Sequence, residues 1–193
     1  IVKGLKASLI YLASSSPRRQ YILKKFGFPF VVIPNLLKQE PKLINSDRLR
    51  HHIKDLAYQK AKLSQMHYKG IVLSADTVIV TSAGDVLGKP TSIEDAVSML
   101  TCLSGHTHQV ITACCVLNTK ENTCRFRSDV CYVTFNTLLE CDINSYCIQH
   151  KPLDKSGGYG IQEIPKHFID YIKGSKWTVM GLPITRLKPI LVS

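Results

Sequence analysis

The chain has 193 residues, of which 45% are hydrophobic and 20% are charged. These proportions are typical of a folded globular protein and exclude an intrinsically disordered one, and no apolar run reaches the roughly 20 residues that a membrane-spanning helix needs. Lysine and arginine outnumber the acidic residues by 25 to 14, a formal net charge of +11 that favours an anionic partner such as a nucleotide or a nucleic acid.

The first half of the chain is predicted to alternate between strands and helices. A short strand at 9–13 runs into a helix at 17–26, in which Ser16 is the expected N-cap and Pro17 the first helical residue. The following elements are a strand at 28–33, a helix at 47–66, strands at 71–80 and 86–87, and a helix that ends near 103. A capping-box pattern at 91–94 opens that last helix.

The second half adds a predicted hairpin and further helices. Its elements are strands at 109–117 and 125–135 around a turn at 118–122, a helix from Asp142 to 149, a glycine-rich loop at 154–160, a strand at 168–172 and a helix at 184–191. This mixture predicts an α/β (α+β) protein with a mixed sheet rather than a purely parallel one. No repeat or linker divides the chain, so we predict a single domain over 1–193, with two lobes sharing one sheet.

The seven cysteines bear on the compartment of the protein. They form no Cys-x-x-Cys pair, and no secretory signal accompanies them. We therefore expect reduced thiols and a cytoplasmic location.

The segment 14–19, Ser-Ser-Ser-Pro-Arg-Arg, places hydroxyl groups and two arginines at a helix start. Free backbone N–H groups and the helix dipole favour an anion there, whereas arginines in the first turn are unfavourable without one. Ser14, Ser16, Arg18 and Arg19 are therefore either parts of a capped, solvated helix end or a phosphate cradle.

A lysine interrupts the apolar face of the long helix. At 100° per residue Lys60 falls among the apolar side chains of Leu49, Ile53, Leu56 and Leu63. A lysine in that position either extends its amine to solvent or meets an anion, because an unpaired buried ammonium is costly.

A carboxylate interrupts the apolar strand at 71–80. Asp76, next to the polar Thr77, needs a cation, a metal or several hydrogen-bond donors. It is therefore a structural ion-pair partner, a metal ligand or a general base. Taken singly, Gly88-Lys89-Pro90 and the loop at 153–162 are each interpreted as a turn. Together with the features above, they supply cations, a fixed acid and a backbone that can closely approach a polyphosphate and a divalent metal.

Other chemistries find less support in the sequence. His106 and His108 lack further ligands at zinc-site spacing. No serine or cysteine lies in a nucleophile-elbow pattern, and the aromatic residues do not alternate with basic ones as in a nucleic-acid-binding sheet. A nucleic-acid partner and a membrane partner are therefore not favoured.

An ordered set of short motifs resembles the Maf family of nucleotide pyrophosphatases over nearly the whole chain. The motifs are LASSSPRR at 12–19, LA and KA at 56–57 and 60–61, ADTV at 75–78, GKP at 88–90, LSG at 103–105 followed by His108, DKSGGYGIQ at 154–162 and GLP at 181–183. Each motif alone is weak, whereas the ordered set is specific.

The resemblance implies a fold and an activity. The fold is an elongated mixed sheet flanked by helices, with two lobes and a central cleft as in inosine-triphosphatase-like proteins, often as a homodimer. The activity is hydrolysis of a nucleoside triphosphate to the monophosphate and pyrophosphate, dependent on Mg²⁺ or Mn²⁺. Members are proposed to remove non-canonical nucleotides and to restrain septum formation.

The resemblance also assigns roles to residues. The family's proton acceptor corresponds to Asp76, and the residues linked to base choice correspond to Arg18, Thr77 and Gln162, as in the branch that prefers dTTP and UTP. Two departures concern the metal: the family's acidic run after the second strand is replaced at 34–40, where Glu40 is the remaining candidate ligand, and Lys151 replaces an acid.

These features combine into one mechanistic hypothesis. Water attacks the α-phosphorus with help from the metal, and Asp76 deprotonates the water or holds the metal. Charge on the departing pyrophosphate is neutralised by Lys60, Lys89 and Arg19, with Ser14 and Ser16 as further donors. Arg18, Thr77 and Gln162 read a pyrimidine edge.

Two alternatives remain open on the sequence. One is a nucleic-acid-binding or septum-regulating module that has kept the fold with impaired catalysis. The other keeps the chemistry but acts on a purine nucleotide, such as ITP or 7-methyl-GTP.

Overall fold

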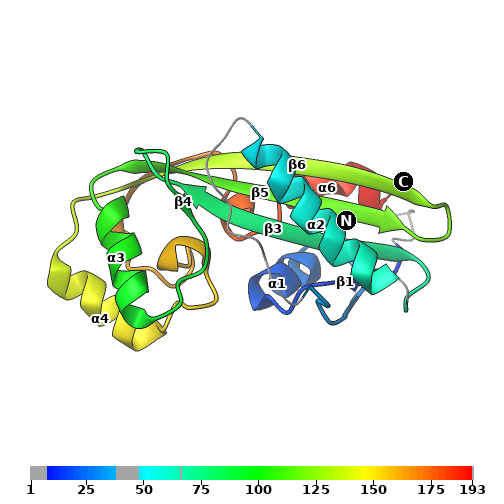
Figure 1. The fold of residues 1–193 in the computed structure, drawn as a ribbon, viewed down its shortest axis with the longest axis horizontal. Helices are drawn as coiled ribbons and strands as arrows, with labels where there is room; N and C mark the ends of the chain where they lie inside the picture. Colours follow the sequence, from blue (N-terminus) through cyan, green and yellow to red (C-terminus); the bar gives the residue numbers. More distant parts are fainter. Residues whose placement is uncertain (1–7, 38–47, 66, 193) are drawn as a thin grey trace.

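The structure is a computed structural model that describes residues 8–37, 48–65 and 67–192. One mixed sheet organises the chain (Figure 1). The elements in chain order are β1 (Ile10–Leu12), α1 (Pro17–Lys25), β2 (Phe30–Val32), α2 (Leu49–Gln65), β3 (Ile71–Val80), β4 (Val86–Leu87), α3 (Ile93–Leu103), β5 (Thr107–Asn118), β6 (Thr123–Phe135), α4 (Glu140–His150), the short 3₁₀ helices η1 (Ser156–Gly158) and η2 (Lys166–Phe168), β7 (Ile169–Lys173), α5 (Lys176–Val179) and α6 (Ile184–Leu191).

The sheet follows the strand order β2-β1-β3-β5-β6-β7, and β4 pairs with β3 off this path. The β1–β2 and β1–β3 pairs are parallel, whereas the pairs of β3 with β4 and β5, of β5 with β6 and of β6 with β7 are antiparallel. The prediction of a mixed α/β fold is therefore confirmed. The long strands β3, β5 and β6 give the sheet the elongated form seen in Figure 1.

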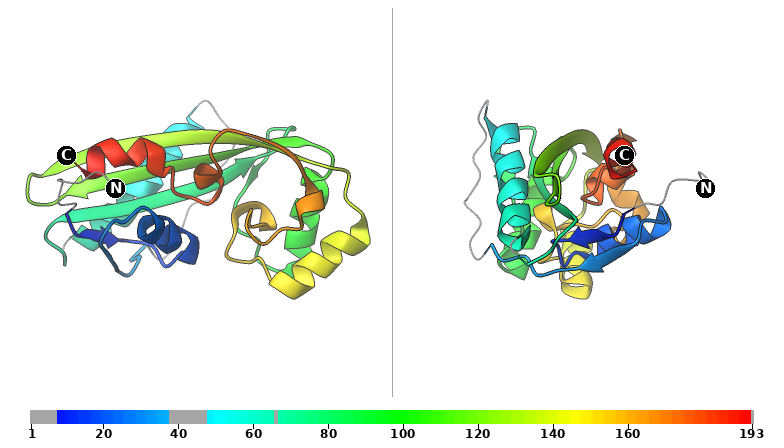
Figure 2. Two further views of the ribbon diagram at one scale, coloured as in Figure 1. Left: turned by 180° about the vertical axis from the view of Figure 1, so that it is seen from behind. Right: turned by 90° about the vertical axis from the view of Figure 1, so that its right-hand side faces the viewer.

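Helices cover both faces of the sheet. Neighbouring residues of a strand point to opposite faces, so they contact different helices. On one face, Val72 and Cys115 pack with Ala57 and Ala61 of α2. On the other face, Leu73 packs in the cluster that includes α6. Figure 2 shows α6 in front of the sheet and α2 behind it, with α3 and α4 gathered at one end. Among the described residues, none of these helices combines the length and apolar character needed to cross a membrane.

The element predictions differ from the structure mainly at ends and in short helices. The second strand is shorter than predicted, and α4 starts at Glu140 rather than at Asp142. The N-cap of α3 is Ser92, which accepts a hydrogen bond from the backbone N–H of Asp95, so the capping box lies one residue later than predicted. The short helices η1, η2 and α5 were not predicted, because segments of three or four residues carry no helical periodicity.

One edge of β3 is interrupted. Strand β1 pairs with Ile71–Leu73, and β4 pairs with Ile79 and Val80. No described strand pairs with residues 74–78 along the edge of β3 that lies between β1 and β4. Along the opposite edge, β5 pairs with all of these residues. This segment therefore has a free edge, and it contains the polar residues Ser74, Asp76 and Thr77.

Candidate functional site

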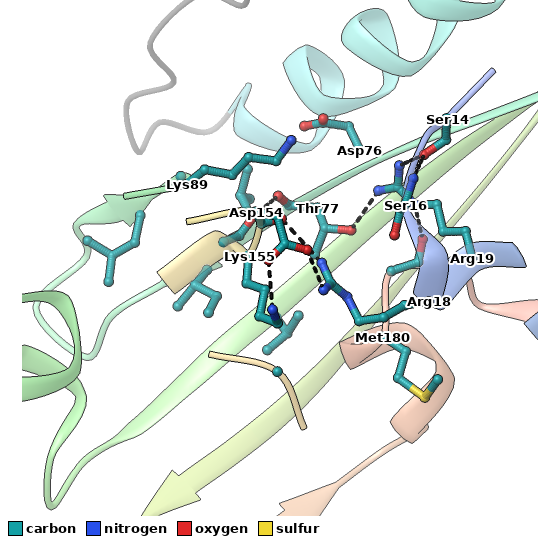
Figure 3. Close-up of a pocket in the computed structure, with 18 of the residues that line it drawn as sticks. Ser14, Ser16, Arg18, Arg19, Asp76, Thr77, Lys89, Asp154, Lys155 and Met180 are labelled. Atoms are coloured by element: carbon teal, nitrogen blue, oxygen red, sulfur yellow. Dashed lines mark hydrogen bonds and ion pairs between the residues drawn. The ribbon is translucent and has the colours of Figure 1, made fainter. Parts of the chain in front are cut away.

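A cavity of about 1000 Å³ lies at the interrupted edge of β3. Its walls come from the start of α1, from α2, from β3, from the segment after β4 and from the loop around η1 (Figure 3). It is lined by most of the residues that the sequence singled out, namely Ser14, Ser16, Arg18, Arg19, Lys60, Asp76, Thr77 and Lys89. The segments that carry cations thus converge on one cavity beside a fixed acid, as the sequence predicts.

Lys60 of α2 meets Asp76 on one face of β3. The ammonium Nζ lies 2.5 Å from Asp76 Oδ1, and both residues are buried. Of the two readings of Lys60, the structure shows contact with an anion. The predicted apolar stripe is wrong at its last member, because Leu63 is 40% exposed whereas Leu49 and Leu56 are buried.

The second carboxylate oxygen of Asp76 has a different environment. Oδ1 holds the ion pair, whereas Oδ2 makes no hydrogen bond to any of the residues that the structure describes. Because Asp76 also lines the cavity, this oxygen can accept a proton or bind a cation from a ligand. The pair therefore combines a buried, charge-compensated carboxylate with one reactive atom.

Arg19 lies on the opposite face of β3 and bonds to several protein acceptors. Its Nε donates to the carbonyl of Gly181 at 2.9 Å, its Nη1 to Ser14 Oγ at 2.9 Å and its Nη2 to Thr77 Oγ1 at 3.4 Å. The guanidinium thus links the start of α1 to β3 and to the turn after α5. It fixes the positions of two hydroxyl groups that line the cavity.

Arg18 already has an anion within the protein. Its Nη1 donates to Asp154 Oδ2 at 2.8 Å and its Nη2 to the Asp154 carbonyl at 3.2 Å. Lys155 donates to the other carboxylate oxygen at 2.7 Å and also pairs with Glu163 at 3.0 Å. Burial raises the pKa of Asp154, but the hydrogen bonds from Lys155 and Arg18 outweigh it, so the pKa lies below its usual value.

The glycine-rich loop around η1 is fastened to the interrupted edge. Ser156 Oγ donates to the carbonyl of Thr77 at 2.7 Å, and the Gly157 N–H donates to the carbonyl of Gly88 at 2.8 Å. Gly157 has a φ of 70°, and an added Cβ would lie 2.3 Å from Ile79 Cδ1. The loop requires glycine here for both its backbone conformation and its close contact with β3, and it fixes the segment that carries Lys89.

A buried histidine supports another wall of the cavity. His108 of β5 bonds through Nε2 to the hydroxyl of Tyr159, which lines the cavity, at 2.7 Å. Its Nδ1 is buried without a hydrogen-bond partner among the described residues. Burial lowers the pKa of His108 to about 4 from the ordinary 6.5, so the ring is neutral at neutral pH.

This neutral histidine makes stability depend on pH. Between pH 6.5 and 4 the unfolded chain binds a proton that the folded protein does not, so acidification favours unfolding. We expect the free energy of unfolding to fall by about 3 kcal/mol more in the wild type than in His108→Gln between pH 7 and 4. Urea unfolding across this range measures the difference, with His106→Gln, at an exposed histidine, as the control. The prediction would be wrong if the free energy of unfolding fell by the same amount in the wild type and in His108→Gln.

Some predicted site residues lie elsewhere. Gln162 is exposed in the turn after Gly160 and does not line the cavity. Glu40 lies outside the described residues. Lys151 has a φ of 42° and ends α4, away from the cavity lining.

The structure adds residues to which the sequence analysis gave no individual role. Asp154, Lys155 and Ser156 line the cavity, and Thr112 supports it from β5. The charges at the start of the DKSGGYG motif could have indicated the first two. Thr112 carries no such signal, because a threonine is ordinary in a β-strand.

The candidate metal ligands are few in the part of the chain that the structure describes. It contains no group of three or more histidine, cysteine, aspartate or glutamate residues placed to hold a metal ion. Asp76 is a buried carboxylate that lines the cavity, and its Oδ2 lies outside the ion pair with Lys60. Mg²⁺ is commonly bound through one or two carboxylates together with substrate phosphates, so this donor set fits a metal that arrives with a nucleotide.

The protein therefore has a mixed α/β fold with a basic cavity at an edge of its sheet. A family model described as "Maf-like protein" matches residues 9–193, and the chain therefore belongs to this family. It is 39% identical over 180 residues to the "dTTP/UTP pyrophosphatase" of Clostridium perfringens (strain 13 / Type A), covering 92% of this chain and 93% of that protein. It is 40% identical over 185 residues to the protein of the same name from Alkaliphilus oremlandii (strain OhILAs), covering 93% of each.

A solved structure is also similar. It is the crystal structure of a nucleoside-triphosphatase, dITP/XTP pyrophosphatase, from Mycobacterium abscessus, with a TM-score of 0.48 and 14% sequence identity. The match covers 95% of this chain and 93% of that chain.

Proposed function

We propose that the protein hydrolyses nucleoside triphosphates to the monophosphate and pyrophosphate, with dTTP and UTP as preferred substrates. The observation that carries the proposal is the convergence of cationic side chains on one cavity beside Asp76. The curated relatives named dTTP/UTP pyrophosphatase support the substrate, because the similarity extends over nearly all of both chains.

Lys89 is the group best placed to meet the phosphates. It is exposed, lines the cavity and forms no ion pair with any other described residue. Figure 3 shows its side chain extending towards Asp76. Its ammonium would neutralise charge that develops on the leaving pyrophosphate, whereas Lys60 compensates the charge of Asp76 itself.

Asp76 supplies the base in this proposal. Asp76 lines the cavity, and its Oδ2, which lies outside the ion pair, would take the proton from the attacking water, while Lys60 keeps the carboxylate in place through Oδ1. In the alternative role, this carboxylate would hold a divalent ion, Mg²⁺ or Mn²⁺, together with substrate phosphates. When bound, such an ion supplies charge neutralisation and lowers the pKa of water.

The test is a panel of nucleotides assayed with Mg²⁺ or Mn²⁺, with separate detection of pyrophosphate and orthophosphate. We expect pyrophosphate release, fastest with dTTP and UTP, and none after chelation of the metal. Release of orthophosphate alone, or no turnover of any nucleotide, would overturn the proposal. Faster turnover of ITP or 7-methyl-GTP would overturn the pyrimidine preference, and salt-sensitive DNA binding without turnover would indicate the non-catalytic alternative.

We also propose that the protein is cytoplasmic and forms a homodimer. Its proposed role is in nucleotide house-cleaning and septum formation. The homodimer is tested by light scattering of the purified protein, for which a monomer mass of 21.6 kDa is the reference.

A further inference from the structure

The hydroxyl of Thr77 is held by a chain of hydrogen bonds that begins outside the cavity. Thr112 of β5 lies directly opposite Thr77 in the sheet, and their Oγ1 atoms are 2.9 Å apart. Thr112 Oγ1 is also 2.8 Å from the backbone carbonyl of Thr178. A carbonyl only accepts, so the single proton of Thr112 goes to Thr178, and Thr77 must donate its own proton to Thr112.

This chain leaves Thr77 without a proton for a ligand. Its oxygen receives a long contact from Arg19 Nη2 at 3.4 Å and otherwise presents a lone pair at the cavity. Thr77 is therefore a hydrogen-bond acceptor only.

Ser14 has the opposite hydrogen-bonding role, because it can donate to a ligand. Its Oγ accepts from Arg19 Nη1 at 2.9 Å and from the Ser16 N–H at 3.3 Å. Both lone pairs are engaged, so the Ser14 proton remains for a ligand. The cavity thus has a hydroxyl that donates and a hydroxyl that accepts, and Arg19 holds both.

The donor role of Ser14 and the acceptor role of Thr77 indicate which part of a nucleotide each hydroxyl contacts. Phosphate oxygens at neutral pH mostly lack hydrogens, so they suit Ser14 and cannot bond to Thr77. Thr77 needs an N–H or O–H group. The cavity wall near it includes the uncharged residues Val179, Met180 and Gly181. An added Cβ at Gly181 would lie 3.2 Å from Thr77 Oγ1, so glycine keeps this approach open.

We propose that Thr112 is a positioning residue that fixes Thr77 as an acceptor for the imide N3–H of uracil or thymine. Cytosine has no hydrogen on N3 and cannot make this bond, so the arrangement discriminates against it. The inference rests on the proposed function and deepens it. Thr112 itself is fully buried and does not line the cavity, so it acts through Thr77.

Thr112→Val tests this by removing the hydroxyl with little change of shape. Thr77 then regains a proton that it can donate to N3 of cytosine. We expect the ratio of kcat/KM for UTP to that for CTP to fall about tenfold, and Thr112→Ser to restore it. The matched control is Thr134→Val, which breaks a similar cross-strand bond, 2.8 Å long, between Thr107 and Thr134, away from the cavity. An unchanged ratio in Thr112→Val would overturn the inference.

A second measurement uses the unmodified protein and does not depend on the folding of a variant. UTP methylated at N3 lacks the donor, whereas UTP methylated at C5 has the same added volume and keeps it. We expect the N3-methyl compound to lose at least about tenfold in kcat/KM relative to the C5-methyl compound. Equal values would show that Thr77 does not receive this hydrogen.

Binding separates this inference from the proposed function. Calorimetry with UMP and CMP gives the base preference without turnover. If no nucleotide yields pyrophosphate, the proposed function fails, whereas a UMP preference that Thr112→Val lowers and Thr112→Ser restores would still support the inference. A wild-type protein that binds UMP and CMP equally would overturn it.

Discussion

Replacement of Asp76 by asparagine is expected to lower the rate of pyrophosphate release by about 10³-fold. The amide cannot accept the proton of the attacking water, and it brings no negative charge to a divalent ion. The same change removes the negative charge that lies 2.5 Å from the buried ammonium of Lys60. We therefore also expect the free energy of unfolding to fall by about 3–5 kcal/mol. Activity is measured by pyrophosphate release and stability by urea unfolding.

The two effects of Asp76→Asn are separated by a double variant. Lys60→Met combined with Asp76→Asn removes both buried charges, so we expect it to recover stability but to remain inactive. Asp85→Asn, at an exposed position between β3 and β4, is the matched control and should retain both properties. More than a tenth of wild-type activity in folded Asp76→Asn would remove Asp76 from the role of base.

Gly157→Ala is expected to destabilise the protein by about 3 kcal/mol and to raise the KM for the nucleotide. The φ of 70° is unfavourable for alanine, and the new Cβ would lie 2.3 Å from Ile79 Cδ1 in the core. Relief of this clash would move the loop away from β3 and weaken the hydrogen bond from Gly157 to Gly88, next to Lys89. Thermal unfolding and steady-state kinetics measure the two effects.

Gly27→Ala is the matched control for backbone strain. Gly27 has a φ of 74°, but an added Cβ would meet nothing within 4 Å, so we expect a cost of only about 1 kcal/mol. The difference between the two variants isolates the clash. Ile79→Val removes the clashing atom and should recover part of the loss in the Gly157→Ala background. Equal costs for Gly27→Ala and Gly157→Ala would contradict the close packing of the loop.

The sequence predicted the parts of the site that break a local pattern. Lys60 interrupts an apolar helix face and Asp76 an apolar strand, and the structure pairs these two residues. Each charge was visible because regular elements make apolar positions periodic. The same periodicity predicted the long elements, including β3, β5 and β6, whose bounds differ from the prediction by at most a few residues.

The remaining contacts could not be predicted because they join residues that are distant in the chain. Arg18 pairs with Asp154, 136 positions away, and Thr112 bonds to Thr178, 66 positions away. No pattern within one segment encodes such a pairing, which depends on how the sheet brings the segments together. The sequence therefore left Arg18 either solvated or in contact with a bound phosphate, and it did not indicate that the protein itself provides an anion.

The interrupted edge of β3 has a consequence for how this family can vary. Asp76 and Thr77 are neighbours in the chain, yet they serve opposite surfaces of the strand. Insertion or deletion of a single residue before them would exchange the surfaces that the two side chains face, since a shift by one turns every side chain over. Length changes should therefore be excluded from β3 but tolerated in the exposed part of the β5–β6 turn at 120–122, whereas substitutions can alter either surface of β3 independently.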